Sequence, residues 1–324
     1  MISAYWNEIK KRIQRNSATL LLLLFCCLLA LFLSIKTGKF LDAVNFFNIL
    51  EANSYRMLLA IGMMLVIASG AIDLSVGSVL SLSAIILAVT LQAGLPVWLC
   101  VALGLLAGTA MGVINGAIIS ITKINAFIIT LGTAFLFRGL SLIITRGTPI
   151  TKLPEAFRAF GSGELWGLEA GVFFALGAVL ILYVVFYKMK WGHYVSSLGG
   201  NAEALRRCGV KTARYRISVF AVTGFLAAMA GVIITARLNS AEANAGLNME
   251  MDAICAVIMG GTLLHGGKGN VVGTVIAVFL LGMIRNSLTL LSISSYYQQF
   301  ITGAILLLAV IVAEYRERKK RVTQ

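Results

Sequence analysis

Apolar segments follow one another along the whole chain, and short polar or glycine-rich stretches separate them. Ten can be recognised, near residues 19–35, 56–70, 74–91, 96–119, 124–145, 170–187, 216–236, 251–265, 270–290 and 297–313. A bilayer is crossed by roughly 20 mostly apolar residues in a helix. The pattern therefore predicts an all-α membrane protein with about ten transmembrane helices, forming one transmembrane domain over residues 1–324.

Composition agrees with this pattern. Hydrophobic residues make up 59% of the 324 residues and charged residues only 12%, and the mean hydropathy is +0.91. Soluble domains are nearer to half apolar and a quarter charged. A soluble core would not hide this much apolar surface, so soluble classes are excluded.

Two pairs of segments are each interrupted by glycines and polar residues: 56–70 with 74–91, and 251–265 with 270–290. Non-helical backbone at membrane depth is tolerated only where protein or a water-filled cavity surrounds it. We therefore predict two interrupted hairpins beside a translocation pathway. The candidate pathway residues are Asp73, Ser75, Gly77, Asn115, Asp252, Arg285 and Asn286.

Ionisable residues among these candidates have two interpretations. An acid within the membrane is a functional candidate by default, yet Asp73 can also serve as a cap for the helix that follows it. Arg285 is the least easily explained by a side chain that reaches from a helix end to the interface. Pairing of Arg285 with Asp73 or with Asp252 remains open from the sequence.

Lysines and arginines are unevenly distributed between alternate loops. With the N-terminus in the cytoplasm, 18 of the 27 basic residues fall on the inner side and 7 on the outer side. Positive loops stay in the cytoplasm, so we predict two cytoplasmic termini, an internal loop at about 188–215 and an external loop at about 146–169. The same bias explains the net charge of +14 without a nucleic-acid partner.

The internal loop contains a predicted short helix. Asn201 is a favourable N-cap residue, and Gly209 suits the left-handed position after the last turn. Glu203 complements the positive start of this helix, and Arg206 and Arg207 complement its negative end. A stable helix is therefore expected between the two caps.

Two interpretations of this short helix remain open. It is either a solvated connection or a docking helix for a cytoplasmic partner. In the second case Ala202 and Leu205, three residues apart, share a face that would enter a groove on the partner. The two arginines would then pair with acidic groups at the rim of that groove.

The stretch 259–270 has a superficial likeness to a phosphate-binding loop. The pattern G-x-x-x-x-G-K-[ST] fails because residue 262 is threonine and residue 269 is glycine. Its glycines are better explained by close packing of helix ends. The five cysteines and two histidines lack the spacing of metal or redox motifs, so we predict no metal site and no catalytic residue.

A ladder of glycines lies within the segment 96–119. Gly104, Gly108, Gly112 and Gly116 are spaced by four residues and share one helix face. Small residues at this spacing let transmembrane helices approach closely, and Asn115 offers a hydrogen bond across such a contact. Whether the contact is within one chain or between two chains is open.

Several short motifs occur in a fixed order between about residues 40 and 313. They occupy residues 62–67, 72–78, 198–201, 236–238, 240–241, 247–256, 260–262, 266–269 and 294–298. In combination they resemble the ribose-type permeases of bacterial ATP-binding-cassette importers. The end of the 201–210 stretch departs from the family by being more basic, which leaves the particular ATPase partner in doubt.

The resemblance implies a fold and a mechanism. Family members are all-helical, and two permease subunits, identical or paralogous, form the channel in the inner membrane. Two cytoplasmic ATPase subunits bind ATP and Mg²⁺, so no cofactor is expected in this chain. A periplasmic or lipid-anchored binding protein delivers the sugar. Residues 201–209 would be the coupling segment that the ATPase moves.

The predicted function is thus a permease subunit, not an enzyme, that carries a monosaccharide such as ribose, with a second copy as its expected partner. Relatives for other sugars share these motifs, and more distant ones carry nucleosides or branched-chain amino acids. An ion-coupled secondary transporter also fits broken helices, although acids within the segments are few. A non-transporting scaffold would leave the interrupted hairpins without a purpose.

Overall fold

The structure is a computed structural model that describes residues 2–38, 40–294, 296–301, 303–305, 307–308 and 311, with the backbone alone for 2–18 and 160–162. Its helices are α1 Ile2–Thr37, α2 Ala43–Ala68, α3 Val76–Gln92, α4 Val97–Thr122, α5 Ala126–Thr145, α6 Glu155–Ser162, α7 Ala170–Lys188, α8 Lys190–Arg207, α9 Thr212–Leu238, α10 Met249–Met259 and α11 Val271–Leu290. The strands are β1 Ile150–Thr151, β2 Glu164–Leu165, β3 Leu168–Glu169 and β4 Ser240–Ala241. The fold is therefore helical, as predicted.

Seven helices in the described part of the chain are long and apolar enough to cross a bilayer. They are α2, α4, α5, α7, α9, α11 and the Thr19–Thr37 part of α1. The predicted segment at 74–91 is also present, as the shorter helix α3 of 17 residues. The chain is thus a multi-pass membrane protein.

One predicted segment differs in the structure, and another is only partly described. Instead of a helix over 251–265, α10 has 11 residues and ends at Met259. Gly260 and Gly261 follow, and Gly261 has a φ of +87°, which an α-helix cannot continue. The helix is therefore too short to cross a bilayer alone. The predicted segment at 297–313 falls partly on residues that are not described.

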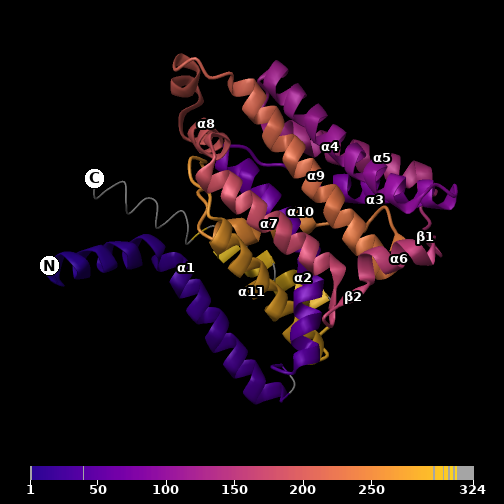
Figure 1. Ribbon diagram of the computed structural model, residues 1–324, viewed down its shortest axis with the longest axis horizontal. Coiled ribbons are helices and arrows are strands. Elements are labelled where there is room, and N and C mark those ends of the chain that lie inside the picture. Colours follow the sequence, from indigo (N-terminus) through magenta and orange to yellow (C-terminus); the bar gives the residue numbers. More distant parts are fainter. Residues whose placement is uncertain are drawn as a thin grey trace.

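The helices have two distinct ends. Figure 1 shows α8 at one end and α6 with β1 and β2 at the other. At the α8 end the backbone N–H of Gly267 donates to the carbonyl of Ala68 at 2.9 Å. At the other end β1 pairs with β4. Of the described segments, the predicted inner ones at 188–215 and 266–269 lie at the α8 end, and the predicted outer one at 146–169 lies at the α6 end.

The loop predicted at 146–169 is folded onto the helices. It contains α6 and the strand pair β2–β3, and its strand β1 pairs with β4, which follows α9. Phe157 of α6 is fully buried, and α6 packs on α9. This cover holds the chain between α5 and α7 close to the bundle.

Helix α2 lies at the centre of the bundle. Every residue from 57 to 68 is buried, and the main neighbours of α2 are α7, α9, α10 and α11. In contrast, α1 lies at the edge of the bundle in Figure 1 and packs on α11, and only 6% of its apolar stretch is buried. The side chains of α1 from residue 19 onward are mostly left to lipid.

The glycine ladder of α4 packs within the chain. A Cβ at Gly108 would lie 2.5 Å from the Cβ of Ala228, and one at Gly116 would lie 2.7 Å from the Cα of Ile217, both in α9. Gly112 lies directly against the carbonyl of Phe220. Gly104 instead faces Ser83 and its neighbours in α3. Gly108, Gly112 and Gly116 therefore make a tight contact within the chain.

We expect Gly112→Leu to force α4 away from α9. The added side chain would collide with the Phe220 carbonyl, and backbone does not move aside as the end of a side chain does. Overpacking of this kind costs about 1–3 kcal/mol. The measurement is the thermal unfolding midpoint of the purified protein in detergent, which should fall.

The control is Gly132→Leu in the middle of α5. A Cβ at Gly132 meets nothing within 4 Å, so the midpoint of this variant should stay near that of the parent. Equal midpoints for the two variants would contradict the tight α4–α9 contact.

Candidate functional site

Helix α8 carries the predicted capped segment. The backbone at Asn201 is extended, with φ −157° and ψ 93°, and its Oδ1 accepts a hydrogen bond from the Ala204 N–H at 2.9 Å. At the other end Gly209 has a φ of +81°, and its N–H donates to the carbonyl of Arg206 at 3.0 Å. Both predicted caps are therefore confirmed. The structure adds a preceding helical part, from Lys190 to the break at Asn201.

Charges on the capped segment pair with one another. Glu203 accepts hydrogen bonds from Arg206 at 2.9 Å and from Arg207 at 3.2 Å. The hydrogen bonds from Arg206, and then from Arg207, lower the pKa of the Glu203 carboxyl below its ordinary value. All three side chains are more than half exposed, so this triad displays an ordered charged surface.

Leu205 is placed differently from the expectation. It is only 8% exposed and lies among the residues of α8 that pack on the chain itself, with Val195 and Leu198. Ala202 is partly exposed, and Ala204 is exposed. A partner at this segment would therefore meet Ala204 and the charged triad, because Leu205 already serves the fold.

A junction of glycines that was not predicted from the sequence lies beside the capped segment. A Cβ at Gly199 would lie 2.6 Å from the nitrogen of Gly267 and 2.9 Å from that of Gly70. A Cβ at Gly266 would lie 2.8 Å from the Cα of Gly70 and 2.9 Å from that of Gly199. The Gly267–Ala68 hydrogen bond joins the same group. We call residues 68–70, 199–200 and 266–267 the glycine junction.

The glycine junction connects three parts of the chain. Residues 68–70 end α2, residues 266–267 lie between α10 and α11, and residues 199–200 precede the capped segment in α8. Both interrupted hairpins thus contact α8 backbone to backbone. The Gly–Gly pairs at 199–200 and 266–267 were the sequence signal, but nothing in the sequence joined them.

Three of the predicted pathway residues form a buried hydrogen-bond chain. Asn115 of α4 donates to the Ser75 hydroxyl at 2.8 Å, and that hydroxyl donates to Asp73 Oδ1 at 2.6 Å. Asp73 also accepts from the Ser75 N–H at 2.8 Å. None of the three is more than 3% exposed. Asp73 thus hydrogen-bonds to Ser75, the residue just before α3. The hydrogen bond from Asn115 joins the start of α3 to α4 and does not cross to α9.

Gly77 lies in the first turn of α3, close to the hydrogen bonds of Asp73, Ser75 and Asn115. Its backbone carbonyl lies directly against Gly246. The N–H of Gly246 donates to the Ser81 hydroxyl at 3.1 Å. The segment before α10 is therefore held against α3.

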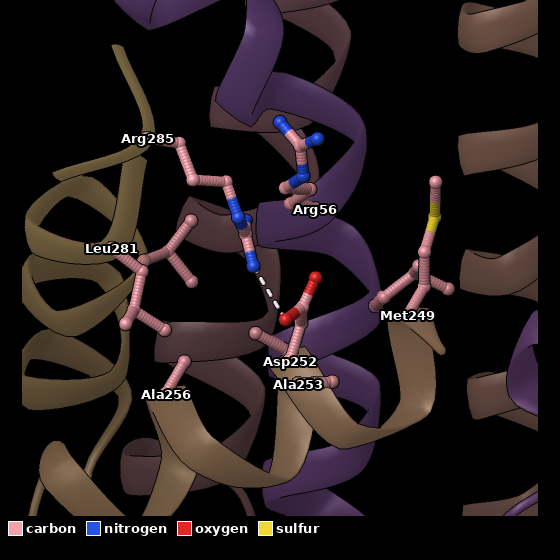
Figure 2. Close-up of a pocket in the computed structure, with 10 residues that line it drawn as sticks. Arg56, Met249, Asp252, Ala253, Ala256, Leu281 and Arg285 are labelled. Atoms are coloured by element: carbon pink, nitrogen blue, oxygen red, sulfur yellow. Dashed lines mark ion pairs between the residues drawn. The ribbon is translucent and has the colours of Figure 1, made fainter. Parts of the chain in front are cut away.

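The other charged candidates meet at α10. Arg285 of α11 and Asp252 of α10 form an ion pair, drawn as a dashed line in Figure 2. This settles the open pairing of Arg285 in favour of Asp252. The neighbouring Asn286 exchanges hydrogen bonds with Asn45 at the start of α2, at 2.8 and 3.1 Å.

Arg56 of α2 shares the small cavity beside this ion pair. Figure 2 shows its guanidinium turned away from Asp252. Its Nη1 donates to the carbonyl of Ala52 at 2.7 Å, and its buried Nε has no hydrogen-bond partner among the described residues. The cavity holds about 10 Å³, the room for one water molecule. A sugar does not fit there in this conformation.

Metal chemistry has no support in the part of the chain that the structure describes. No group of three or more histidine, cysteine, aspartate or glutamate side chains lies close enough to hold an ion. Cys255 and Cys100 are buried as free thiols, and Cys208 is exposed. What the described side chains offer are packing contacts, a capped helix and paired charges.

Comparison with known proteins agrees with this geometry. Residues 45–310 match the family described as "Branched-chain amino acid transport system / permease component". The chain is 40% identical over 291 residues to a ribose import permease protein of Haemophilus influenzae, covering 89% of this chain and 90% of that one. It is also 40% identical over 295 residues to the ribose import permease protein of Bacillus subtilis, covering 90% of each.

A third relative is the D-allose transport system permease protein of Escherichia coli, 35% identical over 284 residues, which cover 87% of each chain. No solved structure matches the chain. The family match covers both interrupted hairpins, the glycine ladder and α8. The chain therefore belongs to the ribose-type permease family of ATP-binding-cassette importers.

Proposed function

We propose that the chain is the membrane-spanning subunit of an importer for a monosaccharide, ribose or a related sugar, in the inner membrane of a bacterium. Two copies would form the channel, with two cytoplasmic ATPase subunits and an external sugar-binding protein. ATP and Mg²⁺ would be bound by the ATPase, so this chain would carry no cofactor and perform no catalysis. Similarity to ribose import permeases over about nine-tenths of each chain supports the substrate class.

The glycine junction is the observation that best supports coupling between the ATPase and the channel. Backbone contact leaves no flexible side chain between α8 and the two interrupted hairpins. A force applied to the charged triad would therefore reach the end of α2 and the middle of the 260–270 loop directly. This arrangement is suited to converting closure of the ATPase pair into a change of access in the channel.

The proposed topology has ten passes and both termini in the cytoplasm. The seven long helices and α3 account for eight passes. The segment from β4 through α10 would form the ninth, and residues near 297–313 the tenth. The basic residues of α8 and the pairing of β1 with β4 at the opposite end support this orientation.

We expect a reporter fused after residue 324 to be active in the cytoplasm. A reporter inserted near residue 155, in the loop that folds as α6, should be active only outside. The measurement is a pair of compartment-specific reporter activities in whole cells. An external C-terminus would contradict the ten-pass topology.

We expect uptake of labelled ribose by proteoliposomes that contain this chain, its ATPase and its binding protein. Uptake should require ATP and should continue when ionophores collapse the ion gradients, because hydrolysis drives the change of access. The charges near α10 also suit an ion-coupled transporter, so the control omits the ATPase and imposes an ion gradient. Uptake in that control would favour the ion-coupled alternative.

We expect Gly199→Ala to uncouple hydrolysis from transport. Its methyl group would press on the Gly267 and Gly70 nitrogens, and overpacking by even one methyl typically costs about 1–3 kcal/mol. Co-purification of the ATPase should persist, because the charged triad is unchanged. ATP-driven uptake should fall several-fold.

The matched control is the adjacent Gly200→Ala. A Cβ at Gly200 would lie 3.8 Å from the Gly267 Cα, an ordinary contact, so this variant should transport like the parent. If Gly199→Ala transports as well as Gly200→Ala, the glycine junction does not transmit the motion.

A further inference from the structure

Helix α10 begins deep within the membrane-crossing part of the molecule. Asp252, in its first turn, lies beside Arg56, which is near the middle of the 26-residue helix α2. At 1.5 Å per residue, the middle of α2 is roughly 18 Å from either end. The first turn of α10 therefore lies alongside the middle of a helix long and apolar enough to cross a bilayer.

The chain reaches this depth without a helix. Ala241 and Ala243 pack with Leu87 and Leu91 in the outer half of α3, while Gly246 already contacts Gly77 near the inner end of α3. Residues 239–248 are thus a non-helical descent along α3, apart from the two residues of β4. Such backbone at membrane depth requires protein or water around it.

Charged side chains from four helices gather around this first turn. Glu250 and Asp252 belong to α10, and Arg285 pairs with Asp252. On the other side Arg138 of α5 donates to the carbonyl of Ala243 at 2.7 Å. Glu250 Oε2 is buried without a hydrogen-bond partner among the described residues. The group, completed by Arg56 of α2, has three cations and two anions.

One side of the group is open to the outside of the chain. Leu247 and Met251 are 57% and 40% exposed, Asn248 is exposed, and the Asp252 and Arg285 side chains are 24% and 18% exposed. Ionised groups at this depth face a bundle interior or a water-filled cavity, not lipid. By comparison, Phe135, Leu136 and Ile143 on the outer face of α5 are all exposed and apolar, as lipid contact requires.

We propose that the first turn of α10, with Arg138 and Arg285, lines the water-filled passage of the importer and hydrogen-bonds the hydroxyls of a neutral polyhydroxylated solute in transit. A carboxylate accepts a hydrogen bond from a hydroxyl, and a guanidinium donates one to it. The two kinds of group therefore match the donor and the acceptor function of a sugar hydroxyl. The inference rests on the proposed function, under which a second copy supplies the opposite wall.

Reactivity of an introduced thiol tests the passage directly. All five native cysteines are first replaced, and Met251→Cys is then compared with Leu136→Cys in proteoliposomes that contain the ATPase. A charged, membrane-impermeant thiol reagent reacts with thiolates in water. Met251→Cys should be labelled in at least one of two states, without nucleotide or with the ATPase trapped by vanadate. Leu136→Cys should not be labelled in either state.

Exposure alone would favour labelling of Leu136→Cys, because Leu136 is more exposed than Met251 in the single chain. Equal labelling of the two positions, or no labelling of Met251→Cys in both states, would overturn the inference. Neither substitution removes a charged group or a buried side chain. Uptake by the parent protein tests the proposed function separately, and a parent that transports while Met251→Cys stays unlabelled would refute only the passage.

Asp252→Asn tests the contact with the solute. Loss of the charge-assisted hydrogen bond should lower ATP-driven uptake about tenfold, with the ATPase still co-purifying. The matched control is Glu242→Gln in the exposed loop after α9, which should transport like the parent. Parent-like uptake by Asp252→Asn would overturn the role assigned to this carboxylate.

Discussion

Contact between glycine backbones is the interaction on which the rest of this structure depends. Apolar side chains gain little by leaving lipid for a helix interface, so close van der Waals packing must hold transmembrane helices together. At the α4–α9 contact, Gly108 and Gly112 lie against the backbone of Gly224 and Phe220. At the glycine junction the same kind of contact joins α8 to both interrupted hairpins. Larger side chains at these points would separate the elements that the proposed mechanism couples.

Polar groups at membrane depth fall into two classes with different consequences. Asp73 has its partners Ser75 and Asn115 inside the chain and is almost completely buried, so it stabilises the broken start of α3. Asp252 has an arginine partner but remains partly exposed, which lipid does not tolerate. The first class explains how a hairpin can be interrupted, and the second indicates where the chain borders water. Both hairpins nevertheless share one anchor, the glycine junction.

Several features of the capped segment could be predicted from neighbouring residues alone. The caps at Asn201 and Gly209 are local properties and are confirmed. The role expected for Leu205 failed because burial depends on what packs over a residue, and Leu205 is buried in its own chain. The extent of α10 was also overestimated, since apolar residues continue past the glycines that end the helix. Pattern and propensity do not show where an apolar run leaves the helical conformation.

The sequence by itself determined the helical membrane architecture, the glycine face of α4, the capped segment and the resemblance to ribose-type permeases. These features depend on hydrophobic period, spacing and local hydrogen bonds, which are written along the chain. Only the tertiary structure decided that Arg285 pairs with Asp252, that Gly199 meets Gly70 and Gly267, and that three of the four ladder glycines pack on α9. Those contacts join residues far apart in sequence, and their selection depends on how whole helices pack, because many partners of equal chemistry are available to each residue.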